Sequence, residues 1–329
     1  MINRSEFALK VKEYSAEFAK IKQEISRSVV GQEEVINALL RALISNGHVL
    51  LEGVPGIAKT LMVRTLSAVT NCTYSRIQFT PDLLPTDIIG ITAFEKDKGF
   101  YVVKGPLFAN FVLADEINRA PPKVQSALLE SMQERQATIG KETFALDPPF
   151  FVLATQNPIE SYGTYPLPEA QLDRFLFKLN VGYPSLEDEQ KILTTNITLR
   201  KFEDIGLMPV FDKFKIIEMQ REVHNIYVDK KIEKYIVRII DATRNPSKYK
   251  LKLGKYIEWG SSPRGSIGLY IASKAEAMLN GKLFVTPHDV KVVSHDVLRH
   301  RITLNYEGQA EGIKHDEVIT EILAKVPVP

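Results

Sequence analysis

The sequence predicts an α/β fold, a mainly parallel five-stranded sheet followed by a small all-α domain. Five short apolar runs in the first half lack polar alternation and are separated by segments of helical periodicity. This pattern is typical of a parallel sheet covered on both faces. After Tyr183 such runs cease and apolar residues return at helical spacing. We therefore expect an α/β domain over residues 1–183 and a helical domain over residues 184–329.

The first half begins with two predicted helices, because apolar residues recur at steps of three or four from Phe7 to Ile25 and again from Val35 to Leu43. Further helices are predicted over Lys59–Val69 and Lys123–Gln133. The five predicted strands are His48–Leu51, Tyr74–Phe79, Phe111–Ala114, Phe150–Ala154 and Phe175–Val181.

Two segments interrupt the alternation of strand and helix. Each has two short runs around a glycine-containing connection, a pattern that favours a β-hairpin. The paired runs are Ile91–Phe94 with Phe100–Val103, and Thr138–Ile139 with Glu142–Phe144. We expect both hairpins to protrude; the alternative is a pair of edge hairpins without a function.

The second half has four predicted helices, at Ile216–Val223, Ile232–Ile240, Ile267–Leu279 and Val290–Leu298. Ser262 and Pro263 predict the start of the third, because serine caps helices and proline is favoured in the first turn. Asn280 and Gly281 predict its end.

Composition excludes several classes of protein. Lys and Arg number 42 against 40 Asp and Glu, so the net charge of +2 lacks the basic excess of a dedicated nucleic-acid binder. The single cysteine, Cys72, allows no internal disulfide and indicates a reducing compartment, the cytoplasm. The longest stretch without charged residues is Pro148–Ile159, shorter than the ~18 residues of a membrane span. No secretory signal is visible.

The strongest candidate site is GVPGIAKT, Gly53–Thr60, between a predicted strand and a predicted helix. Glycines let the backbone wrap around phosphate, and successive N–H groups and the helix N-terminus point at negative charge. Lys59 can reach the β- and γ-phosphates, and Thr60 can bind Mg²⁺. The usual pattern has glycine where this chain has Ala58, and alanine fits there if the backbone angles are ordinary. The alternative is a glycine-rich turn without a ligand.

Two more predicted strands end in polar residues, at the sheet edge where ligands of open α/β sheets gather. In FVLADE, Asp115 can hold Mg²⁺ directly or through water, and Glu116 can orient the water that attacks the γ-phosphate. In FFVLATQNP, Asn157 can position that water or sense the γ-phosphate. The alternatives are an acidic pair that caps the next helix and an asparagine that forms a turn before Pro158.

The sequence resembles the AAA+ ATPases and, within them, the MoxR group, which is related to the magnesium chelatase ATPase subunit. The resemblance spans most of the chain. It rests on VVGQEEV near Gly31, GVPGIAKT at Gly53, FVLADEINRAPPKVQSALLESMQE from Phe111, ATQNP from Ala154, LPEAQLDRF from Leu167 and SPRG from Ser262. In that group alanine at the Ala58 position is usual, so this departure supports the narrower assignment.

The resemblance implies an AAA+ P-loop NTPase core with a helical lid, and ATP with Mg²⁺ as its ligands. It implies that Asn157 is the sensor 1 asparagine, Arg174 the arginine finger that reaches a neighbouring subunit's nucleotide, and Arg264 the sensor 2 arginine. The alternative for both arginines is a surface ion pair, with Asp173 or another carboxylate. Lys59 and Glu116 complete the predicted catalytic set. The predicted nucleotide contacts are Val30, Gly31 and Gln32 on the adenine side, then Gly53, Val54, Pro55, Gly56, Ile57, Ala58, Lys59, Thr60, Leu61 and Asp115, with Thr60 and Asp115 as metal ligands.

The resemblance also implies a homo-oligomeric ring, expected to be hexameric, with the two hairpins facing its central channel. Phe100, Tyr101 and Lys141 are then candidate contacts for a client protein. The implied function is chaperone-like remodelling, maturation or metal-cofactor insertion of a partner, often one with a von Willebrand factor A domain. Two alternatives stay open, a non-catalytic ATP-dependent switch and a DNA-translocating motor.

Other motifs favour ordinary roles. The basic run from Lys248 to Tyr256 is expected to be a solvated face rather than a nucleic-acid site. The histidines lack a metal-ligand constellation, so no structural metal is expected. Arg119 and Arg135 favour structural or interface roles and are left unassigned.

Overall fold

The computed structural model describes residues 4–54, 56, 59–97, 99–157, 163–195 and 202–329. Its centre is a five-stranded parallel sheet in the order β2–β5–β8–β1–β9. The strands are β1 (Val49–Gly53), β2 (Tyr74–Gln78), β5 (Phe111–Asp115), β8 (Phe151–Gln156) and β9 (Phe177–Val181). The five predicted strands and their parallel arrangement are therefore confirmed.

Both faces of the sheet are covered. Successive residues of one strand point to opposite faces, so Val49 and Leu51 join one hydrophobic core whereas Leu50 joins another. This explains why the three central strands, β5, β8 and β1, read as continuous apolar runs, whereas the edge strands β2 and β9 include polar residues. The helices of this half are α1 (Arg4–Ser26), α2 (Glu33–Ile44), α3 (Lys59–Val69), α4 (Pro85–Ile89), α5 (Pro122–Glu134) and α6 (Glu169–Leu172), with a 3-10 helix at Ile117–Arg119.

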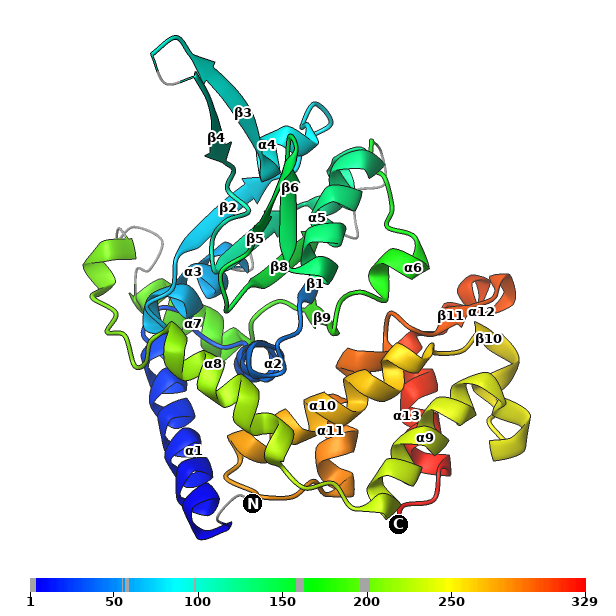
Figure 1. Ribbon diagram of the computed structural model, residues 1–329. Helices are drawn as coiled ribbons and strands as arrows, with labels where there is room; N and C mark the ends of the chain where they lie inside the picture. Colours follow the sequence, from blue (N-terminus) through cyan, green and yellow to red (C-terminus); the bar gives the residue numbers. More distant parts are fainter. Residues whose placement is uncertain (1–3, 55, 57–58, 98, 158–162, 196–201) are drawn as a thin grey trace.

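Two antiparallel hairpins interrupt the α/β alternation, as predicted. One pairs β3 (Gly90–Glu95) with β4 (Gly99–Lys104), and the other pairs β6 (Gln136–Ile139) with β7 (Glu142–Ala145). The first hairpin projects away from the body of the protein, at the top of Figure 1.

The second half is helical, with a small two-stranded sheet of β10 (Ile257–Trp259) and β11 (Thr303–Leu304). Ser262 caps the start of α10, where its Oγ accepts a hydrogen bond from the N–H of Arg264 at 3.1 Å. The sequence analysis did not predict α7 or α13. The helices are α7 (Leu186–Thr195), α8 (Lys213–Glu222), α9 (Lys230–Arg244), α10 (Pro263–Leu279), α11 (Pro287–Leu298), α12 (Tyr306–Ala310) and α13 (His315–Lys325), with 3-10 helices at Phe202–Ile205, Val223–Asn225, Pro246–Tyr249 and Leu253–Tyr256.

Helix α1 packs on the helical half, at the bottom of Figure 1. The hydroxyl of Tyr14 donates to Glu218 at 2.8 Å, and that of Ser15 donates to the carbonyl of Leu279 at 3.0 Å. One hydrophobic core runs from α1 and the sheet into helices α8, α9, α10, α11 and α13. The domain boundary at Tyr183 stays a prediction. No helix in the described part of the chain is long and apolar enough to cross a bilayer.

Candidate nucleotide-binding site

Lys59 is the first residue of α3 and lies next to the end of β1. Its Nζ donates a hydrogen bond to the carbonyl of Gly53, the last residue of β1. Burial lowers the pKa of Lys59, and the carboxylates of Asp115, Glu116 and Glu52 act in the opposite direction. An ammonium group that is partly desolvated and faces carboxylates from several elements is suited to a strongly anionic ligand.

The described part of the connecting loop has room for such a ligand. Gly56 has φ +84°, and a Cβ added there would meet nothing within 4 Å. The first N–H groups of a helix have no partner within the helix and carry a partial positive charge. Thr60, the second residue of α3, is half-buried, and Val54 and Leu61 pack on the core. Pro55, Ile57 and Ala58 lie outside the described residues.

Asp115 ends β5 with both carboxylate oxygens engaged. Oδ1 accepts a hydrogen bond from the hydroxyl of Thr155 in β8 at 2.6 Å. Oδ2 accepts from Nη2 and Nε of Arg76 in β2, at 2.7 and 3.1 Å. The sequence analysis missed both partners. Thr155 had a signal, because it is the first polar residue after the apolar run of its strand.

Glu116 has left-handed backbone angles, φ 57° and ψ 49°, a strained conformation for a non-glycine residue that clusters at functional sites. Its N–H donates to the hydroxyl of Thr155 at 2.8 Å. Its carboxylate accepts from Nε2 of Gln78 at 3.0 Å and pairs with Nε of Arg119 at 2.9 Å. The side chain makes no capping hydrogen bond to the following 3-10 helix. The helix-capping alternative for Glu116 is therefore wrong, and Arg119 is a partner of this carboxylate.

The segment of residues 30–32, predicted to contact the adenine, and Asn157 reach the same edge of the sheet. Buried Asn157 follows Gln156, which pairs in register with Glu52 of β1. Nε2 of Gln32 donates at 2.8 Å to the carbonyl of Gly182, the residue after β9. A pocket of 960 Å³ opens beside this contact and includes Val30, Gly31 and Gln32 in its wall.

Arg174 and Arg264 lie together at the opposite edge. Both line a pocket of 270 Å³ with His48, the residue before β1. The strands are parallel, so this pocket lies at their amino-terminal edge, whereas Gly53 and Asp115 end strands at the other edge. A five-residue strand separates the two edges by about 16 Å, at ~3.3 Å per residue. The structure therefore does not bring either arginine to Lys59 of the same chain.

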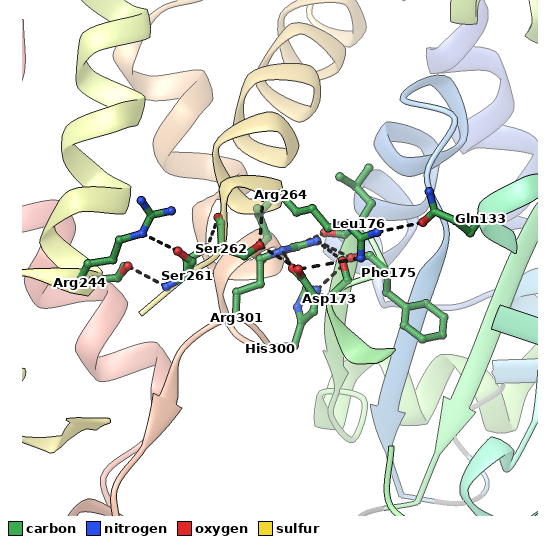
Figure 2. Close-up of polar contacts among 12 residues, drawn as sticks. Gln133, Asp173, Phe175, Leu176, Arg244, Ser261, Ser262, Arg264, His300 and Arg301 are labelled. Carbon is green, nitrogen blue, oxygen red and sulfur yellow. Dashed lines mark hydrogen bonds and ion pairs between the residues drawn. The ribbon is translucent and has the colours of Figure 1, made fainter. Parts of the chain in front are cut away.

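The surroundings of the two arginines differ. Nη2 of Arg264 donates to Oε1 of Gln133 at 3.1 Å, and Nη1 lies 4.0 Å from Oδ2 of Asp173 (Figure 2). Arg174 is exposed, and its side chain forms no ion pair with any described residue. The alternative of a surface ion pair therefore applies to Arg264 only through its 4.0 Å contact with Asp173, and does not apply to Arg174. Nearby, Arg135 has a structural role, because its guanidinium donates to the carbonyls of Phe150 and Asn46.

Comparison with known proteins decides the family. Residues 48–177 match the model of the ATPase family associated with various cellular activities (AAA), and residues 253–322 match that of the AAA lid domain. "Chaperone MoxR1" of Mycobacterium tuberculosis is 47% identical over 313 residues, 93% of this chain and 81% of that protein. The chain belongs to the MoxR family of AAA ATPases. "Protein MoxR" of Paracoccus denitrificans is 30% identical and covers 97% of this chain and 98% of that protein.

Solved structures agree with this assignment. The crystal structure of a putative ATPase from Cytophaga hutchinsonii is 45% identical and superposes with a TM-score of 0.91, over 99% of this chain and 98% of that chain. As a MoxR-family AAA ATPase, the protein binds and hydrolyses ATP.

The residues present also fit a magnesium ion. Within the described residues, no group of three or more His, Cys, Asp or Glu could hold a metal by itself. Mg²⁺ prefers oxygen ligands and typically takes one or two from the protein, completing its shell with phosphate oxygens and water. The Thr60 hydroxyl and the Asp115 carboxylate are ligands of this kind.

Proposed function

We propose that the protein hydrolyses Mg-ATP at sites shared between neighbouring subunits of a hexameric ring, and that the ring remodels or matures a partner protein. Lys59 would hold the β- and γ-phosphates, and Glu116 would orient the attacking water. Asn157 would sense the γ-phosphate. Thr60 and Asp115 would hold Mg²⁺, which when bound neutralises charge on the phosphates.

The proposal of a shared site rests on the position of Arg174 and Arg264. Both lie at the amino-terminal edge of the sheet, whereas Lys59 of their own chain lies at the carboxyl edge. An arginine that neutralises charge on the transferred phosphoryl group contributes roughly 10³- to 10⁵-fold to the rate. Arg174 is an exposed residue without an ion-pair partner among the described residues, and Arg264 lines the same pocket. Both would therefore serve the nucleotide of the adjacent subunit, so hydrolysis would depend on assembly.

A mixing experiment tests the shared site. Glu116→Gln disables a subunit's own site, and Arg174→Ala disables the arginine that it offers to its neighbour. Each variant alone should have little activity, and a mixture should recover part of the wild-type rate because some sites combine an intact Glu116 with an intact Arg174. Specific activity of the wild type should also rise with protein concentration. A mixture no more active than its components would contradict the proposal.

The β3–β4 hairpin supports the remodelling function. Its side chains Phe94 and Phe100 are 64% and 78% exposed, with ring centroids 5.0 Å apart, and Tyr101, the next residue of β4, is 41% exposed on the opposite face of the hairpin. Apolar groups gathered on a projecting element mark a surface for binding proteins. The curated relative from Mycobacterium is called a chaperone. We propose a client with a von Willebrand factor A domain, whose maturation can include metal-cofactor insertion.

The client function is tested with a Glu116→Gln trap. In ATP the variant should assemble, stall and retain a purified von Willebrand factor A domain protein from the same cells, and Lys59→Ala should not. Stimulation of the wild-type ATPase by single-stranded DNA would instead favour a DNA-translocating motor. The basic run adds no support to that alternative, because it was expected to be a solvated face and its Lys248, 66% exposed, pairs with Asp241 at 2.6 Å.

A further inference from the structure

The loop before β9, which carries Arg174, is held by a buried arginine from the helical half. We infer that Arg301, three residues after the end of α11, is a positioning residue that sets Arg174 for the nucleotide of the neighbouring subunit. This inference rests on the proposed role of Arg174.

Arg301 contacts the backbone on both sides of Arg174 (Figure 2). Its Nη2 donates to the carbonyl of Asp173 at 3.2 Å and to that of Phe175 at 2.6 Å. Its Nη1 donates to the carbonyl of Leu176 at 3.0 Å. The guanidinium group presents five N–H donors in a fixed plane. One side chain therefore holds the backbone from the residue before Arg174 to the second residue after it.

The same guanidinium is fixed by charge. Nε of Arg301 donates to Oδ1 of Asp173 at 2.8 Å, and the Arg301 side chain is only 3% exposed. Nη1 also donates to the carbonyl of Val297 in α11. Removing one member of a buried ion pair leaves the other charge without compensation. The loop and the end of α11 are therefore held together by a contact that is costly to break.

Asp173 connects the contacts of Arg301 to Arg264, the other arginine that lines the pocket with Arg174. Its Oδ2 accepts from the hydroxyl of Ser262, the cap of α10, at 2.8 Å. Nη1 of Arg264, two residues later, lies 4.0 Å from the same oxygen. His300 adds a contact between its Nε2 and the carbonyl of Phe175, 3.0 Å apart. The network thus fixes the segments that carry Arg174 and Arg264 relative to each other.

A positioning role is indicated because Arg301 holds the backbone around Arg174 but does not contact the Arg174 side chain. The acceptors of Arg301 in the loop lie on residues that flank Arg174, whereas Arg174 is an exposed residue whose side chain makes no ion pair in the described part of the chain. The backbone around Arg174 is held, and its side chain is left available to a neighbouring subunit. An arginine that acts across an interface needs this arrangement, because a misplacement of about 1 Å can reduce a rate ~100-fold.

The test compares Arg301→Met with Arg299→Met as a matched control. Arg299 lies at the same helix end, is partly buried with 12% of its side chain exposed, and donates to Asp316 at 2.8 Å and to the carbonyl of Lys178, without contacting residues 173–176. We expect Arg301→Met to lower kcat about 10- to 100-fold, with the ATP affinity of its own site within about twofold of wild type. Arg299→Met should retain its kcat.

Mixed assemblies separate positioning from a general folding defect. Arg301→Met mixed with Glu116→Gln should recover activity, because the Glu116→Gln subunit offers a correctly held Arg174. Arg301→Met mixed with Arg174→Ala should not recover. Where Arg301→Met does not fold, Arg301→Lys and Asp173→Asn replace it. Lysine keeps the charge but cannot reach three carbonyls in the fixed geometry of the guanidinium, so kcat should again fall without a change in ATP affinity.

Two results overturn the inference in different ways. If Arg174→Ala lowers kcat and a folded Arg301→Met does not, the positioning role is wrong and the shared site stands. If Arg174→Ala leaves kcat unchanged, the proposed function fails first and the inference fails with it. Equal losses of kcat and ATP affinity, without recovery in the Glu116→Gln mixture, would make Arg301 a purely structural residue.

Discussion

Asp115 and Arg76 form an ion pair at the carboxyl edge of the sheet, with Nη2 of Arg76 2.7 Å from Oδ2 of Asp115. The Arg76 side chain is 49% exposed, so solvent screens the pair and the contact is worth roughly 1 kcal/mol or less. The carboxylate that we propose as a Mg²⁺ ligand is therefore already partly neutralised by the protein.

This relationship predicts a competition between Arg76 and Mg²⁺. Arg76→Met should lower the Mg²⁺ concentration for half-maximal ATP hydrolysis, by up to about fivefold for ~1 kcal/mol. Arg76→Lys is the control, because it keeps the charge and should change the midpoint less. A Mg²⁺ titration of ATPase activity checks the prediction. A higher midpoint in Arg76→Met would mean that Arg76 holds Asp115 in place rather than competing for it.

Removing the Lys59 ammonium should abolish hydrolysis and weaken nucleotide binding. Its Nζ donates to the carbonyl of Gly53 at the end of β1 and faces the carboxylates of Asp115, Glu116 and Glu52. Without the ammonium group, the phosphates of ATP would face these negative charges uncompensated. We expect Lys59→Ala to reduce ATP affinity at least ~10-fold, about 1.4 kcal/mol, in a fluorescent-nucleotide binding assay. Lys123→Ala, on the exposed side of α5, should bind like wild type. Unchanged binding by Lys59→Ala would exclude this loop as the phosphate site.

The exposed aromatic pair of the β3–β4 hairpin should matter for clients and little for stability. Phe94 and Phe100 are largely solvent-exposed, so the double change to serine should alter the free energy of unfolding by no more than about 1 kcal/mol. Basal ATPase activity should stay at the wild-type level, and stimulation by an unfolded model protein such as casein should be lost. Undiminished stimulation would remove this pair from the client surface.

The free energy of unfolding should fall in mildly acidic solution because of two buried histidines. Nδ1 of His48 accepts from the N–H of Val152 at 3.0 Å, and a proton on Nδ1 would break this bond. Burial lowers the pKa of His48 and of His300 well below the ordinary value of 6.5. The unfolded state therefore binds more protons below pH 6.5, so this stabilisation is complete above that pH and is lost as the pH falls toward the folded-state values.

Each histidine can contribute a slope of up to about 1.4 kcal/mol per pH unit in this range. Urea unfolding at pH 7.5, 6.5 and 5.5 measures it. The double variant His48→Gln, His300→Gln should be less stable at pH 7.5 but have a flatter profile. An equal slope in wild type and variant would assign the pH dependence to other groups.

Much of the sheet could be predicted from local patterns, because a strand buried on both faces is a continuous apolar run that ends at a polar residue. Asp115, Glu116 and Asn157 all lie at such ends, and the structure brings them to one edge with Gly53. Helices α7 and α13 were missed, although apolar residues such as Val318 and Ile322 of α13 have helical spacing. The roles of Asp115, Glu116 and Asn157 at the nucleotide stay predictions.

The arginine network could not be predicted, because its partners are distant in sequence. Arg301 and Asp173 are 128 residues apart, and nothing local marks Arg301 or connects it to Asp173. The contact of His300 with the carbonyl of Phe175 likewise needed the fold, because 125 residues separate the two in sequence. The same is true of Arg76, a single charge in a short strand whose partner lies on the neighbouring strand.

The core that α1 shares with the sheet and with α8, α9, α10, α11 and α13 has a mechanical consequence. The two halves of a protomer are joined by continuous apolar contact, so a movement of one half against the other would have to break this packing. Each protomer should then turn as one stiff block, and the stroke of a ring would occur at the joints between protomers, where Arg174 would meet the next nucleotide.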